Sequence, residues 1–109
     1  MAFTAYHNID GATATVNELI PIKTITKDKI SSILISNTDN ASVTVSLYLF
    51  KESTSEAAAE TYYFCKDTII PVGASVLFDD ASLVSFDSIS YSLYIAVGSS
   101  DTVDVMINK

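Results

Sequence analysis

The amino-acid sequence predicts an all-β protein, an antiparallel β-sandwich of jelly-roll or Ig-like type with about eight short strands. Three observations lead to this fold class. Apolar and polar residues alternate with a period of two in several segments, as in strands with one buried face. Residues that favour turns separate these segments at nearly regular spacing. The 109 residues suffice for one hydrophobic core, so we expect a single domain, residues 1–109.

The N-terminal half contains four predicted strands, at residues 3–9, 13–19, 29–37 and 42–51. In the third, Ser31 and Ser32 shift the phase of the alternation, which predicts a bulge. The fourth is the most regular, because its valines and leucines fall on one face and Tyr48 and Phe50 on the other. The sequence Asn-Thr-Asp-Asn at 37–40 favours a turn and predicts a hairpin between the third and fourth strands.

The C-terminal half contains four more predicted strands, at residues 61–70, 75–79, 89–97 and 102–108. The first of these is apolar on both predicted faces, whereas the last two alternate, with Met106 interrupting a polar face. Turn residues at 71–73 and 98–101 separate the strands, and the last two read as an acidic hairpin. Segment 53–60, STSEAAAE, favours helix but is short, so we predict a loop with at most one helical turn.

Composition narrows the classes of function. No apolar run approaches the roughly 18 residues of a membrane-spanning helix, and the first residues lack the basic and apolar regions of a signal peptide. The formal net charge is −7 and arginine is absent, which disfavours nucleic-acid binding. We therefore expect a protein made in the cytoplasm that binds neither membrane nor nucleic acid.

The sequence offers little for catalysis. His7 and Cys65 are the only residues of their kinds, and no nucleophile-elbow motif is present. We expect a surface histidine and a buried cysteine. Zinc requires more histidine and cysteine ligands than this chain has, and the spacing of Asp79, Asp80 and Asp87 matches no calcium loop. We predict no catalytic residue, no cofactor, no metal and no enzymatic activity.

Aromatic residues are the remaining candidates for function. The chain has 6 tyrosines and 5 phenylalanines, more aromatic area than one thin core needs. Aromatic side chains are favoured at the centres of protein interfaces. Two interpretations stay open, a second half of the core or contacts with another subunit. The candidate subunit contacts are Phe3, Tyr6, Tyr48, Phe50, Tyr62, Phe64 and Tyr94.

Four segments carry a resemblance to a known group of proteins. They are ILISNTD at 33–39, VTV at 43–45, KDTIIPVGAS at 66–75 and VDV at 103–105. In this order they resemble small virion structural proteins of tailed bacteriophages, common in marine phages. The chain departs from that pattern in its longer 53–60 loop and in having IPIK at 20–23, where a Val-Pro-Ala-Gly-Lys turn is commoner. The resemblance implies a compact β-sandwich that coats or joins parts of a particle, without enzymatic activity.

The leading hypothesis is a capsid decoration or cement protein that stabilises the phage head. It would act in the virion, assembled in the host cytoplasm, as a small homo-oligomer such as a trimer bound to the major capsid protein or another virion protein. One alternative is a tail, neck or fibre-base component of the phage. A third hypothesis is a carbohydrate-binding β-sandwich module, because tyrosine rings can stack on sugars.

Overall fold

The predicted all-β class is confirmed in a computed structural model that describes residues 3–20, 30–80, 84 and 91–108, with the backbone alone for 3–8. The described residues form eight strands, close to those expected from the alternation. The strands are β1 (Phe3–Asp10), β2 (Val16–Ile20), β3 (Ser32–Asn37), β4 (Val43–Lys51), β5 (Glu60–Ile70), β6 (Ser75–Phe78), β7 (Ser92–Val97) and β8 (Thr102–Asn108).

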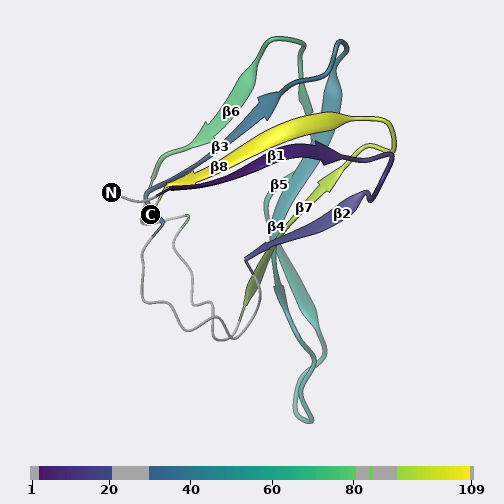
Figure 1. Cartoon of the computed structure of the whole chain (residues 1–109). Coiled ribbons are helices and arrows are strands. Elements are labelled where there is room, and N and C mark those ends of the chain that lie inside the picture. Colours follow the sequence, from purple (N-terminus) through teal and green to yellow (C-terminus); the bar gives the residue numbers. More distant parts are fainter. Residues whose placement is uncertain (1–2, 21–29, 81–83, 85–90, 109) are drawn as a thin grey trace.

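The strands form two antiparallel sheets that face each other (Figure 1). Sheet A has the order β1-β8-β3-β6 and sheet B the order β2-β7-β4-β5. The chain pairs with itself in a nested series, first strand with last, second with seventh, third with sixth and fourth with fifth. This double hairpin, rolled so that β3 meets β8 and β4 meets β7, has the topology of a jelly roll. It differs from the Ig-like order that the sequence left open.

The nested pairing corrects two of the predicted hairpins. The turn after Asn37 carries the chain from β3 in sheet A to β4 in sheet B, and the turn before Thr102 carries it from β7 in sheet B to β8 in sheet A. Among the described connections, only residues 52–59 join hydrogen-bonded neighbours, β4 and β5. Residues 53–60 were expected to be a loop, and this loop ends a hairpin that extends beyond the other strands (Figure 1).

The core lies between the inner faces of the two sheets. Cross-strand register places Ile35 opposite Val105 in sheet A and Leu47 opposite Ile95 in sheet B. All four are fully buried, as the alternation predicts. The buried aliphatic side chains from both sheets form one cluster, which includes Ile33, Val43, Val45, Leu93, Val97, Val103 and Ile107.

Strand β5 pairs irregularly with β4, and it carries apolar residues on its outer face too, where Tyr63 and Ile69 are exposed. Its pairing with β4 shifts register twice, on either side of Leu47, so residues of β5 are added relative to β4. At one shift Asp67 has a φ of 49°, and its N–H donates to the hydroxyl of Ser46 at 2.8 Å. Because of these shifts Cys65 is half-buried, and the full burial expected of it is wrong. The bulge expected at Ser31 and Ser32 is also absent, since β3 begins at Ser32 with regular pairing.

Asn37 holds the turn after β3 against the end of β5. Its side-chain amide donates to the carbonyl oxygens of Ala41 and Ile70, both at 2.9 Å. Its amide oxygen accepts from the N–H of Asp39 at 2.8 Å. The Asn37 residue is buried, so these bonds satisfy polar groups that water does not reach easily. This one side chain therefore links the two crossings at this end of the sandwich.

A second junction joins the turns at 11–15 and 98–101. The carboxylate of Asp101 accepts from the N–H of Thr44 at 2.9 Å, and the Asp101 carbonyl accepts from the N–H of Gly11 at 2.8 Å. A Cβ on Gly11 would overlap the carbonyl oxygen of Gly98, and a Cβ on Gly98 would overlap the Asp101 carboxylate. The close approach of these turns therefore requires glycine at both positions.

We expect Leu47→Ala and Leu93→Ala each to lower the free energy of unfolding by about 2 to 5 kcal/mol, because each leaves a cavity between the sheets. Urea unfolding measures the change. Leu77→Ala is the matched control, since Leu77 is 55% exposed, and should cost well under half as much. Equal losses at buried and exposed leucines would contradict the assigned core.

We expect Asn37→Ala to lower the free energy of unfolding by about 1 to 3 kcal/mol, because it leaves the Ile70 carbonyl without this donor. The same measurement on Asn40→Ala provides the control, since Asn40 is exposed in the same turn. If the two variants were equally stable, the link between the crossings would be unimportant for folding.

Candidate interaction surfaces

The outer face of sheet B carries a row of side chains in register across all four strands. Glu18 lies opposite Tyr94, Tyr94 opposite Tyr48, and Tyr48 opposite Tyr63. We call Tyr94, Tyr48 and Tyr63 the aromatic row. The rings of Tyr48 and Tyr94 stack with centroids 5.6 Å apart and planes 7° apart, while Tyr63 is tilted against Tyr48 at 5.3 Å. Such cross-strand ring contacts stabilise a sheet face.

The electrostatics of the aromatic row favour neutral tyrosines. Burial raises the pKa of Tyr48 above its ordinary value, and the neighbouring Tyr63 raises it further. Burial also raises the pKa of Tyr94, with a further increase from the hydrogen bond to Glu18 and its negative charge. At the end of the row the Lys66 ammonium lies 5.2 Å from the centre of the Tyr63 ring, within range of a cation–π contact. The row is therefore a mixed aromatic and charged surface.

The structure brings together three of the seven predicted contact residues. Tyr48 and Tyr94 lie in the aromatic row, and Phe50 meets Tyr94 edge to face at 6.1 Å. Tyr62 is exposed and contacts Tyr91, away from the row. Phe64 is half-buried against the core, as the alternative interpretation of the aromatics expects.

The remaining two predicted contacts lie in β1. The backbone of Phe3 pairs with Asn108 and that of Tyr6 with Val105. Their side chains lie outside the described part of the structure. Sequence reasoning also missed Tyr63, which is 48% exposed, because the two register shifts in β5 decide which of its tyrosines joins the row.

The outer face of sheet A carries an apolar stripe that the sequence analysis did not select. Leu34 lies opposite Met106 on one side and Leu77 on the other, so the three residues cross β8, β3 and β6 in register. Met106 is 40% exposed and Leu77 is 55% exposed. We call these three residues the apolar stripe. The available signal was Met106, which interrupts the polar face of its strand, but only the register shows that it has apolar neighbours.

A polar row runs beside the apolar stripe. Asp104, Ser36 and Ser75 lie opposite one another on the same three strands. The hydroxyls of Ser36 and Ser75 are 3.0 Å apart and form a hydrogen bond. Because these side chains are short, they leave the longer leucine and methionine side chains accessible to another molecule.

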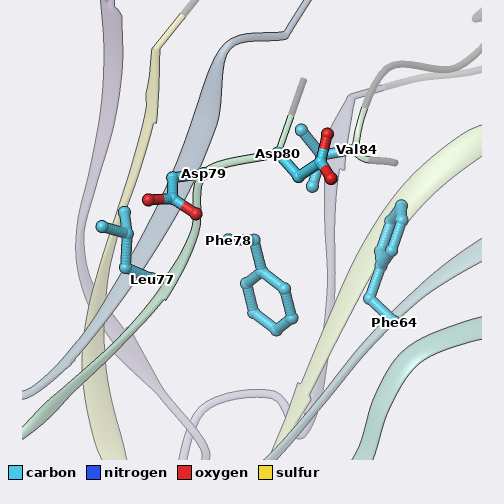
Figure 2. A pocket seen from close by; sticks show the side chains of 6 residues that line it. All are labelled: Phe64, Leu77, Phe78, Asp79, Asp80 and Val84. Carbon is cyan, nitrogen blue, oxygen red and sulfur yellow. The ribbon is translucent and has the colours of Figure 1, made fainter. Parts of the chain in front are cut away.

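A pocket lies between β5 and β6, which stand at the ends of the two described sheets opposite to β2 and β1. Figure 2 shows its six lining side chains, with the Phe78 ring between Leu77 and Phe64. The rings of Phe64 and Phe78 are 6.2 Å apart and tilted by 52°. The cavity volume is about 280 Å³. Its lining residues are Phe64, Leu77, Phe78, Asp79, Asp80 and Val84.

The candidates for chemistry remain scattered in the described part of the chain. No three histidine, cysteine, aspartate or glutamate residues gather there into a group that would hold a metal ion. Asp79 and Asp80 line the pocket, while Asp87 and the His7 side chain lie outside the described residues. No described helix has the length and apolar character needed to cross a membrane.

Comparisons with known proteins found no matching family model, no similar curated protein and no similar solved structure. The geometry of the two sheet faces and the resemblance in the sequence are therefore the basis for the function proposed below.

We expect the free energy of unfolding to fall as pH rises above about 10, because Tyr48 and Tyr94 have raised pKa values in the folded state. A raised pKa gives stabilisation that is complete below the pKa of the unfolded chain and is lost as pH rises through the folded value. Urea unfolding across this range measures the slope. Tyr48→Phe should make the slope shallower, while Tyr62→Phe, outside the aromatic row, is the control. An unchanged slope in Tyr48→Phe would contradict this assignment.

Proposed function

We propose that this protein is a non-enzymatic structural component of a tailed-phage particle, a capsid decoration or cement protein that acts through subunit contacts. The observation that carries the proposal is the apolar stripe across three neighbouring strands, in which Met106 and Leu77 are exposed on either side of half-buried Leu34. Exposed apolar side chains in a continuous row are typical of surfaces that meet another protein. The resemblance in the sequence supplies the phage context.

The fold is compatible with this role. Jelly rolls build many viral capsid domains, although they also occur in lectins and other proteins, so the fold alone does not decide the function. The sandwich presents the apolar stripe on sheet A and the aromatic row on sheet B, on opposite outer faces. Two such faces suit a component that contacts two neighbours, for example a second copy in a small oligomer and the major capsid protein.

Placement elsewhere in the phage is the nearest alternative, because a tail, neck or fibre-base component needs the same kind of surface. Density for this chain in an intact particle would distinguish these locations from the head. The carbohydrate-binding hypothesis has less support. Sugar platforms need exposed coplanar rings, whereas Tyr48 and Tyr94 stack on each other and so cover one face of each ring.

We expect the purified chain to self-associate and its attachment to particles to depend on apolar contact more than on charge. Replacing Leu77 and Met106 by serine should weaken attachment on the order of tenfold, because apolar burial is lost. Ile69→Ser with Val72→Ser is the matched control, since both residues are exposed outside the apolar stripe. Light scattering measures self-association, and sedimentation with particles measures attachment.

A salt series tests whether charge contributes to attachment. With a net charge of −7, the chain gains little from long-range attraction to an acidic shell, so salt should release little protein. A strictly monomeric chain that leaves the particle at modest salt would overturn the apolar-contact model. Particle binding that is unaffected by Leu77→Ser with Met106→Ser would show that the apolar stripe is not the contact.

A further inference from the structure

The aromatic row on the outer face of sheet B has an opposite charge at each end. Glu18 on β2 lies opposite Tyr94 and accepts a hydrogen bond from its hydroxyl. At the other end the Lys66 ammonium lies 5.2 Å from the centre of the Tyr63 ring. Both charged residues are exposed, and each is held at the row by a contact with the nearest tyrosine. From β2 to β5 the order is therefore a negative charge, three rings and a positive charge.

The rings lie where the centre of an interface would be. Four strands spaced by about 4.8 Å place the two ends of the row about 14 Å apart. Tyr48 lies near the middle, on β4, and Phe50 follows two residues later on the same face of that strand. Protein interfaces often have an aromatic centre and a polar rim. The outer face of sheet B has this arrangement.

The order of charges makes the row complementary to a second copy of itself. Two copies of one chain most often meet through a two-fold axis, so that each uses the same surface. With the axis along β4, the two rows run in opposite directions, and Glu18 meets the second copy's Lys66 while Tyr48 meets the second copy's Tyr48. With the axis along the row, Glu18 would instead meet Glu18, and Lys66 would meet Lys66. Like charges repel, so the charges select the first arrangement.

We propose that the chain forms a two-fold dimer through the outer faces of sheet B, with the aromatic row at the centre and Glu18 of each copy beside Lys66 of the other. This inference deepens the self-association proposed above and rests on that part of the proposed function alone. Three partly buried tyrosines supply less than the roughly 800 Å² per partner of a standard interface. We therefore expect a weak dimer, with a dissociation constant in the micromolar range.

Charge reversal tests the arrangement. Glu18→Lys and Lys66→Glu each place like charges together at both ends of the dimer, so each should raise the dissociation constant about three- to thirtyfold. An equimolar mixture of the two variants should recover the original affinity, because each charge then meets its opposite. Sedimentation of the full chain over a concentration series measures dimerisation. Glu56→Lys and Lys51→Glu are the matched controls, since they change the net charge equally outside the row, and should have effects below about twofold.

Two neighbouring tyrosines test the centre of the interface. Tyr63→Ser should raise the dissociation constant about tenfold or more, because each dimer loses two rings from the row. Tyr62→Ser is the matched control, since Tyr62 is 47% exposed and Tyr63 is 48% exposed, but Tyr62 contacts Tyr91 outside the row. Its effect should stay below about twofold. Leu77→Ser with Met106→Ser, on sheet A, should leave the dimer intact.

Four results would overturn the proposal. One is a chain that stays monomeric up to millimolar concentration. Equal effects of Tyr62→Ser and Tyr63→Ser would place the contact elsewhere, and loss of the dimer in the Leu77→Ser, Met106→Ser variant alone would assign self-association to the apolar stripe. Full affinity in both Glu18→Lys and Lys66→Glu would exclude rows that run in opposite directions. A dimer with the expected responses that does not attach to particles would support this interface and contradict the phage role.

Discussion

Burial of one apolar face on each sheet is the constraint on which the rest of the structure depends. A single four-stranded sheet would leave Ile33, Ile35, Val103 and Val105 in water, and the facing sheet covers them. Nested pairing meets this need while keeping consecutive strands mostly in different sheets. The chain must then cross between sheets at the ends of the sandwich. The hydrogen bonds that hold these crossing turns therefore help to keep the two sheets in contact.

The crossings are held by a few polar side chains with several partners each. Asn37 joins the end of β3 to the end of β5, and Asp101 joins β4 to the turn after β1. Turns between sheets lack the regular hydrogen bonds of paired strands, so their main-chain groups need other partners. The side chains of Asn37 and Asp101 each supply such partners. Gly11 and Gly98 allow two such turns to approach. Function is then left to the outer faces and free edges, which the crossings do not use.

The alternation of residues predicted the features that a single strand determines, namely its position and its buried face. It did not predict the features that depend on how two strands pair, namely the register and the partner strand. The alternation in 42–51 and 102–108 gave the strands and their buried faces, because burial follows the period-two geometry of a single chain. The turn at 37–40 was also recognised, but turn residues reverse the chain equally well for a hairpin and for a crossing between sheets. The register shifts in β5 belong to its pairing with β4, and one of them involves a bond from Asp67 to Ser46 across the sheet, so neither the half-buried Cys65 nor the place of Tyr63 could be predicted from β5 alone.

The apolar stripe and the pocket follow the same logic, since both join residues from different strands. Leu77 belongs to both, because it ends the stripe on β6 and lines the pocket at the edge of that strand. The short side chains of Ser36 and Ser75 lie beside the stripe, so a flat partner surface can reach its leucines closely. A partner lying along the stripe toward β6 would arrive at the pocket mouth without crossing the other sheet. One contact surface can therefore bury apolar side chains both on the outer face of sheet A and at its β6 edge.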